Sequence, residues 1–182
     1  TATVASNGKR TGLNLRYANG PILGTVSYLR EGRDGGSTDY NKGVKGGFAF
    51  TFPSATKVGL VYEQLTWPTN TTELKRKHTL VTLSQNLGAV DLNATYGKAK
   101  AAQISGADLA NTGAKFLTLT GAYSFSKRTL AYLSYNKIDN EARAAYDFFS
   151  LGGSRFNGPA AGTPNVLGAD PKTIHLGVNH SF

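Results

Sequence analysis

The sequence predicts an all-β protein, arranged as an antiparallel up-and-down transmembrane β-barrel. Three observations predict this fold class. Apolar and polar residues alternate along about nine segments, the connections between them are alternately short and long, and one face of the segments is apolar while the other is polar. The 182-residue chain contains no run of about 18 apolar residues, which argues against a transmembrane helix.

Six segments alternate cleanly with a period of two, which is the side-chain spacing of a β-strand. Leu13, Leu15 and Tyr17, for example, alternate with Asn14 and Arg16. The six segments cover residues 13–17, 46–52, 58–63, 91–96, 117–125 and 174–182. Further strands are expected at about 22–30, 75–86 and 129–137. Apolar residues occur in both phases of these three strands, so the sequence leaves their faces undecided.

The connections between the strands fall into two classes that alternate strictly along the chain. Tight turns are expected at 18–21, 53–56, 86–89 and 126–128. Long polar loops are expected near 31–41, 66–74, 97–114 and 138–171. In an up-and-down sheet this order puts every tight turn at one end and every long loop at the other, as in outer-membrane barrels.

A soluble β-sandwich would show the same alternation, so the composition of the two faces decides between the folds. The apolar face has aromatic residues near the strand ends, where they would form girdles at two membrane interfaces. They are Tyr17, Phe50, Phe52, Tyr62, Tyr96, Tyr123, Phe125 and Phe182. The opposite face is too polar to pack against a second sheet without unmet hydrogen bonds. It contains Asn14, Arg16, Asp91, Asn93, Thr95, Thr118, Thr120, Ser124, His175, Asn179 and Ser181, which favour a water-filled interior.

Two motifs carry a family resemblance. Segment 174–182 ends on Phe182 and has a hydrophobic or aromatic residue at every second position before it, and it resembles the C-terminal strand of bacterial outer-membrane proteins. Segment 123–129 resembles the turn before the penultimate strand of general diffusion porins. Together they are similar to the β-proteobacterial branch of trimeric porins. The resemblance implies that residues 1–182 are the C-terminal portion of one barrel domain, integral to the bacterial outer membrane.

The strand count departs from that family. Its barrel has sixteen strands, whereas about nine are visible here, and an odd number places Thr1 on the extracellular side. The chain also has no Met, so Thr1 is not the start of a primary translation product. We therefore expect a fragment or downstream piece of a sixteen-stranded porin. The alternative is a ten-stranded barrel in which residues 1–6 form the missing strand, although they show no apolar alternation.

The charge of the chain suggests which solutes it would favour. Twenty Lys and Arg residues against 11 Asp and Glu give a formal net charge of +9. The resemblance implies passive diffusion of small hydrophilic solutes, with a preference for anions. The candidate pore-lining residues are Arg16, Lys45, Lys57, Arg76 and His175. Other basic residues are expected in loops and at rims, where they would bind lipopolysaccharide phosphates or remain solvated: Lys9, Arg10, Arg30, Arg33, Lys98, Lys100, Arg143 and Arg155.

The resemblance also implies partners. A porin of this branch is expected to be a homotrimer in contact with outer-membrane lipids and lipopolysaccharide, and to require the missing N-terminal barrel strands. Val178, His180 and Phe182 would form the signal that the barrel assembly machinery reads. Within the long loop near 138–171, Phe148 and Phe149 are expected to pack into the barrel mouth. A small barrel without a pore, serving as an adhesin or a structural anchor, remains the alternative function.

Other function classes find little support. The chain has no Cys, which excludes disulfides, a Cys-ligated zinc site and thiol catalysis. His175 and His180 are five residues apart on one strand and therefore face opposite sides, so they cannot share a metal. Neither a G-x-S-x-G elbow nor a phosphate-binding loop is present. The aromatic residues alternate with apolar rather than basic residues, which argues against nucleic-acid binding. No cofactor and no enzymatic activity are expected.

Overall fold

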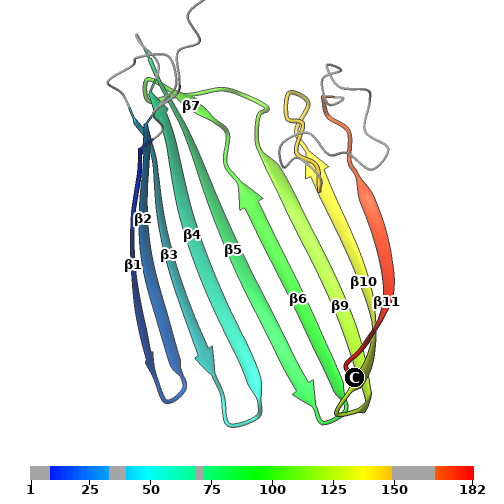
Figure 1. Ribbon diagram of the computed structural model, residues 1–182. Helices are drawn as coiled ribbons and strands as arrows, with labels where there is room; N and C mark the ends of the chain where they lie inside the picture. The colour runs from blue at the N-terminus through cyan, green and yellow to red at the C-terminus, as the bar shows by residue number, and fades with distance from the viewer. Residues whose placement is uncertain (1–8, 33–39, 69–71, 149–166) are drawn as a thin grey trace, which may run out of the picture.

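The computed structural model describes residues 9–32, 40–68, 72–148 and 167–182. Nine long strands form one antiparallel sheet in which each strand pairs with the next along the chain (Figure 1). They are β1 (Arg10–Asn19), β2 (Ile22–Gly32), β3 (Tyr40–Thr51), β4 (Thr56–Pro68), β5 (Glu73–Leu87), β6 (Val90–Ala99), β9 (Ala114–Ser126), β10 (Thr129–Asn140) and β11 (Lys172–His180). Two short strands, β7 (Gln103–Ile104) and β8 (Ala107–Asp108), form a hairpin against the upper end of β5. The predicted all-β, up-and-down organisation is confirmed.

The short connections lie at one end of the sheet, which we call the turn end, and the long ones at the other, the loop end (Figure 1). Two tight turns use glycine in a left-handed backbone conformation, namely Gly20 with a φ of 53° and Gly88 with a φ of 77°. Glycine is favoured there because a Cβ atom makes this conformation costly. Asn86 supports the second turn, since its side-chain oxygen accepts a hydrogen bond from the Gly88 N–H.

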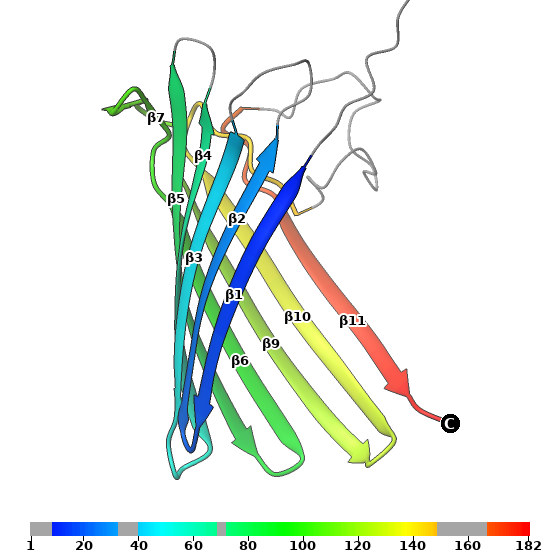
Figure 2. The same cartoon turned by 60° about the vertical axis from the view of Figure 1, so that its left-hand side comes forward.

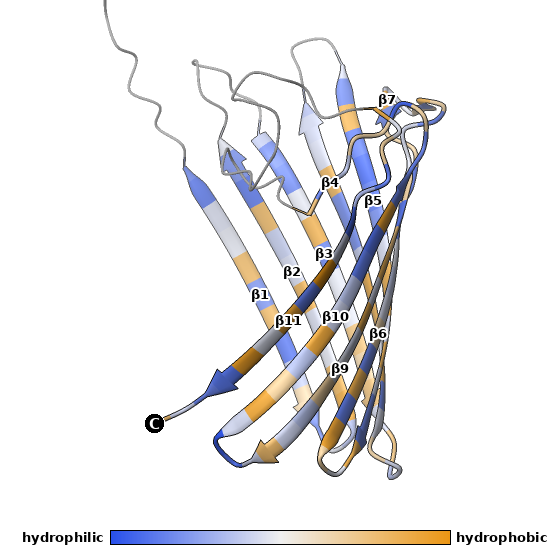
Figure 3. Ribbon diagram, turned by 90° about the vertical axis from the view of Figure 1, so that its right-hand side faces the viewer, coloured by the Kyte–Doolittle hydropathy of each residue, from blue (hydrophilic) through white to orange (hydrophobic). Residues whose placement is uncertain are grey.

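The sheet curves into an open gutter with a concave and an outward face (Figure 2). Glycines show which phase lies inside. A Cβ atom built on Gly47 or Gly59 would lie within 3 Å of a side-chain oxygen on a neighbouring strand, at 2.9 and 2.6 Å, whereas Gly24 and Gly46, in the opposite phase, face open space. Side chains in phase with Gly47 therefore converge on the concave face. Figure 3 shows the resulting alternation of hydrophilic and hydrophobic residues along the strands.

The pairing register assigns the three strands whose faces the sequence left undecided. Val26, Val81 and Leu133 lie in phase with the outward apolar residues of the neighbouring strands. Leu80 and Tyr132 therefore face the concave side. The ring of Tyr132 occupies space left by Gly177 on β11, where a Cβ atom would lie 2.5 Å from it.

Most of the few buried side chains lie at the loop end. The buried apolar residues in the described part of the chain are Ala102, Ala114, Ile138 and Ala144 at this end, and Ala49 further down the sheet. Thr112 is buried with them, where it accepts a hydrogen bond from the Ala102 N–H and donates one to the Leu109 carbonyl. The sheet is otherwise a single layer without a packed interior, which argues against the soluble sandwich.

The strands reach further toward the loop end than the alternation predicts. Strand β2 continues to Gly32 and β10 to Asn140. The expected loop near 97–114 contains the β7–β8 hairpin. Residues 1–6, invoked for a tenth barrel strand, lie outside the described residues. In the described ranges, no helix is long and apolar enough to cross a membrane.

Candidate functional site: the concave polar face

All five candidate pore-lining residues lie on the concave face by their strand register. Arg16 pairs with Thr25, Lys45 with Ser27 and Glu63, and Lys57 with Thr51 and Ser84. Arg76 pairs with Leu65, and His175 with Ser134. The structure brings Lys45 and Arg76 into one group at the loop end. Lys57 and His175 lie nearer the turn end, on a row of paired residues that runs from β4 to β11.

The group at the loop end, which we call the polar cluster, consists of Lys45, Glu63, Arg76, His78 and Tyr146. Glu63 is its centre, because its carboxylate lies 3.4 Å from Nδ1 of His78 and 3.9 Å from Nζ of Lys45. The guanidinium of Arg76 donates a hydrogen bond to the Tyr146 hydroxyl and lies 5.4 Å from the centre of its ring. The ring of His78 meets that of Tyr146 edge-on at 6.4 Å.

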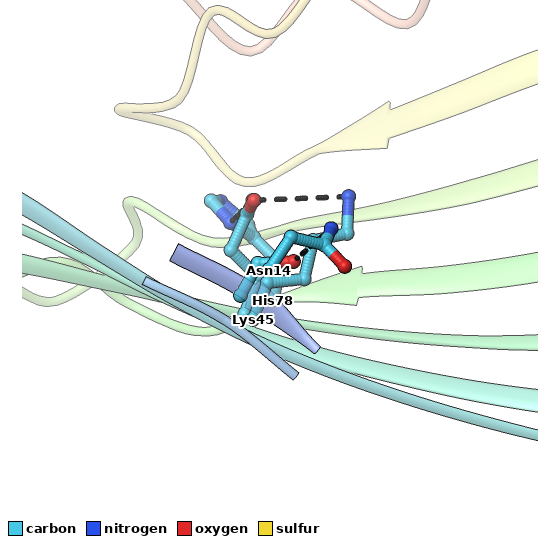
Figure 4. A network of polar contacts seen from close by, with 5 residues as sticks. Asn14, Lys45 and His78 are labelled. Atoms are coloured by element: carbon cyan, nitrogen blue, oxygen red, sulfur yellow. Dashed lines mark hydrogen bonds and ion pairs between the residues drawn. The ribbon is translucent and has the colours of Figure 1, made fainter. Parts of the chain in front are cut away.

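A network of uncharged polar side chains continues from this cluster across the concave face. Asn14 donates a hydrogen bond of 3.0 Å to the Ser27 hydroxyl, and Ser27 is the register partner of Lys45. Asn14, Lys45 and His78 project to the same side of the sheet (Figure 4). Between β9 and β10, the Thr118 hydroxyl donates a hydrogen bond of 2.6 Å to the side-chain oxygen of Asn136. The hydroxyls of Thr120 and Ser134 form another, of 2.9 Å. These groups satisfy one another's hydrogen-bonding capacity and can also bind water, as the lining of a water-filled space requires.

The segment 141–148, which follows β10, folds onto the concave face. It carries Tyr146 to the polar cluster and places the ring of Phe148 6.3 Å from that of Phe116 on β9. Phe148 therefore packs where the sequence predicts, whereas Phe149 lies outside the described residues. The inward Leu80 lies beside Phe116, close to Gly97. The segment and the apolar residues on the concave face at this level thus line one pocket, in which Leu80 and Phe116 are half-buried.

Asn140, the last residue of β10, holds the segment in place. Its side-chain oxygen accepts a hydrogen bond from the Tyr146 N–H at 2.9 Å, and its side-chain nitrogen donates to the Tyr146 carbonyl at 3.0 Å. The same nitrogen donates to the Ala169 carbonyl at 2.6 Å. Glu141 adds a second attachment, because its carboxylate accepts a hydrogen bond of 2.8 Å from the Gly113 N–H. The segment is therefore fixed to both flanking connections rather than to the sheet alone.

Positively charged side chains outnumber negatively charged ones on the strands of the concave face. Its charged strand residues are the cations Arg10, Arg16, Lys45, Lys57 and Arg76 and the carboxylates Glu31, Glu63 and Asp91. Arg10 and Glu31 form an ion pair at the loop end. Of the other cations, Lys45 is loosely held by Glu63, and Arg76 has an uncharged acceptor, Tyr146. Cationic side chains therefore outnumber carboxylates on the described strands of this face.

The outward face has the opposite character. Large hydrophobic side chains are exposed on it in consecutive strands, including Leu15, Phe48, Leu119 and Leu176 at 62%, 52%, 45% and 79%. Near the turn end, aromatic pairs two residues apart stack edge to face: Phe50 with Phe52, Tyr123 with Phe125, and His180 with Phe182. Such a continuous apolar surface is unusual in contact with water and typical of a lipid-facing sheet.

A curved antiparallel sheet with a polar concave face and an apolar outward face is the architecture of a membrane channel wall. The family model described as Gram-negative porin matches residues 1–143 of the chain. The chain belongs to the Gram-negative porins. A search among curated proteins finds no match. Membership of this family makes the protein an outer-membrane channel and agrees with the resemblance found in the two C-terminal motifs.

Sequence reasoning missed three members of the polar cluster of this porin. The alternation includes Glu63 but gives it no role, and it does not single out His78 or Tyr146 as lining residues. Glu63 and His78 stand in the same polar phase as Lys45 and Arg76, so the phase was a usable signal for them. Tyr146 had no such signal, because its position depends on the fold of segment 141–148.

Proposed function

We propose that this porin forms a water-filled channel for passive diffusion of small hydrophilic solutes and that the channel favours anions. The observation that carries the proposal is the concave face, where a network of uncharged polar side chains lies among five Lys and Arg residues and three carboxylates. Selectivity in such a channel arises from its width and the charge of its lining, without covalent chemistry.

The polar cluster is the part of this face best placed to act on a passing ion. Segment 141–148 narrows the space above the sheet at the level of Arg76 and His78, so a solute there passes close to both side chains. A charge acts most strongly where the aqueous path is narrow and its walls have a low dielectric constant. We therefore assign Arg76 and Lys45 a larger share of the selectivity than Lys57 or His175.

Reversal potentials in planar bilayers test the proposal. In a tenfold KCl gradient, the porin is expected to pass Cl⁻ more readily than K⁺, and the double variant Lys45→Gln with Arg76→Gln is expected to lose most of that preference. Tyr146→Phe is the matched control, because it removes the hydroxyl that Arg76 contacts but no charge. Cation selectivity of the unaltered porin would contradict the anion preference. Absence of any conductance would instead favour the adhesin or structural anchor.

The assembly of the channel is a second part of the proposal. Val178 and His180 lie in one phase of β11, and Phe182 follows two residues after the strand ends, with its ring 4.9 Å from that of His180 and exposed. The exposure of these three side chains supports their role as the signal for the barrel assembly machinery. The porin would complete a sixteen-stranded barrel with further N-terminal strands and associate as a homotrimer among lipids and lipopolysaccharide. Cross-linking of the porin in its native membrane tests the trimer.

A further inference from the structure

A pocket lies beside the polar cluster, between the concave face and segment 141–148, and we call it the loop-end pocket. Its volume is about 440 Å³, which falls in the range of about 300–1,000 Å³ typical of small-molecule sites. Tyr146 and Phe148 line it from the segment. Two adjacent rows of paired residues line it from the sheet, with large apolar side chains around small ones: Leu80, Gly97, Ala99, Ala114, Phe116 and Ile138.

Small residues on β6 and β9 give the loop-end pocket its depth. Gly97 pairs with Leu80 on one side and Phe116 on the other. A Cβ atom built on Gly97 would lie 3.5 Å from each of these two side chains, which is ordinary contact, so their packing does not require glycine there. Ala99 and Ala114, which pair with each other in the next row, extend the hollow toward the polar cluster. Larger apolar residues at these positions would bury more surface, and the small ones leave that space open to a solute.

Arg76 provides a positive charge at the edge of the loop-end pocket. Its guanidinium donates a hydrogen bond to the hydroxyl of Tyr146, which lines the pocket. Among the residues that the structure describes, no carboxylate lies within ion-pair distance of Arg76. A carboxylate placed beside this pair would accept hydrogen bonds from the guanidinium and from the phenol O–H, and charge-assisted bonds of this kind are among the strongest in proteins.

Two carboxylates that line the loop-end pocket limit the charge of a solute there. Glu63 belongs to the polar cluster, where Nζ of Lys45 lies 3.9 Å from it. The carboxylate of Asp147 accepts a hydrogen bond from the Phe148 N–H, and no cation in the described part of the chain lies within ion-pair distance of it. One negative charge on a solute is attracted by Arg76, whereas a second would be repelled by Asp147.

We propose that the loop-end pocket binds solutes that carry one carboxylate on a compact apolar ring, as aromatic monocarboxylates do. The ring would occupy the hollow beside Leu80 and Phe116, and the carboxylate would reach Arg76 and the Tyr146 hydroxyl. Binding is weak enough for release, as passage through a channel requires. The assignment rests on the water-filled, anion-favouring path of the proposed function, and it adds the class of organic anion that this path selects.

Block of the Cl⁻ current in planar bilayers tests this site. Hydrocinnamate, a phenyl ring on a propionate chain, is added to the unaltered porin, and propionate is the probe that has the same carboxylate without the ring. We expect hydrocinnamate to block with saturation, at a half-blocking concentration at least about tenfold lower than that of propionate, because its ring leaves water for the apolar hollow. Phenethylamine, which has the ring with an ammonium group in place of the carboxylate, should block less than hydrocinnamate.

The variant Ala99→Leu fills the hollow without a change of charge and should raise the half-blocking concentration of hydrocinnamate about tenfold. Thr95→Leu is the matched control, because it inserts the same side chain four residues away on β6, on the same face and outside the loop-end pocket. It should leave the block unchanged.

Equal block by propionate, or equal or stronger block by phenethylamine, would overturn the proposal without the use of any variant. An unchanged half-blocking concentration in Ala99→Leu would also overturn it. The reversal potential of the unaltered porin in KCl alone reports the anion preference separately. A porin that prefers Cl⁻ but shows no block that depends on the ring would therefore refute this site and leave the proposed function standing.

Discussion

A charge placed on the outward face should destabilise the membrane-inserted protein far more than the same charge on the concave face. Leu119 and Thr118 are consecutive residues of β9 and therefore provide a matched pair. Leu119 is 45% exposed on the outward face, opposite Ala94 and Tyr135 on the two neighbouring strands. Thr118 faces the concave side, where its hydroxyl donates a hydrogen bond to the side-chain oxygen of Asn136. The perturbation is Leu119→Arg, with Thr118→Arg as the control.

The expected size of the effect follows from the depth of Leu119 in the sheet. On β9 it lies four residues from Lys115 near the loop end and seven from Ser126 at the turn end, so it is well inside the apolar band. Arginine on the lipid face near the bilayer midplane costs about 2–4 kcal/mol. Thr118→Arg removes one side-chain hydrogen bond, which contributes about 1 kcal/mol, and leaves its charge in contact with water.

Urea unfolding of the porin in lipid vesicles measures this difference. Trp67, the one tryptophan of the chain, provides the fluorescence signal. We expect the free energy of unfolding to fall by about 2–4 kcal/mol in Leu119→Arg and by about 1 kcal/mol in Thr118→Arg. Equal losses in the two variants, or a larger loss in Thr118→Arg, would refute the assignment of the outward face to lipid.

Three other variants test the loop segment, a turn and the C-terminal signal. Asn140→Ala removes three side-chain hydrogen bonds, together about 2–4 kcal/mol, so amide exchange at Tyr146 should become faster; unchanged exchange would show that the segment is held otherwise. Gly88→Ala should cost about 1–2 kcal/mol in urea unfolding because of its φ of 77°, whereas Gly46→Ala, which faces open space, should cost less than about 1 kcal/mol. Phe182→Ala should reduce assembly in cells without changing the stability of the folded porin by more than about 0.5 kcal/mol, and a large loss of stability would assign the ring a packing role instead.

The faces of most strands could be predicted because a membrane channel wall has a different solvent on each side. Leu15, Leu119 and Leu176 alternate with polar residues, and the period of two then decides the orientation of each side chain. The alternation does not decide the orientation of Leu80, which is apolar but faces the concave side. Leu80 is half-buried there, in a pocket that Phe116 and Phe148 also line, so an apolar residue is only partly in contact with water.

The polar cluster could be predicted only in part, because it depends on register between strands. The alternation shows that Lys45, Glu63 and His78 share a face, but not that they stand in one row of paired residues. Register is decided by turn geometry and by the match of apolar surfaces across strands, which single-strand patterns do not contain. The position of Tyr146 is harder to predict. It is fixed by hydrogen bonds from Asn140 to an irregular segment, which has no periodic pattern in the sequence.

The central claim is that the concave face lines a water-filled path and the outward face contacts lipid. Because the chain has no Cys, single cysteines at Ser134 and Leu133, neighbours on β10, can be labelled uniquely. A charged, membrane-impermeant thiol reagent, added to the porin in planar bilayers, should react rapidly with Ser134→Cys and lower the current, while Leu133→Cys in lipid stays unmodified. Rapid modification of Leu133→Cys together with protection of Ser134→Cys would contradict the claim.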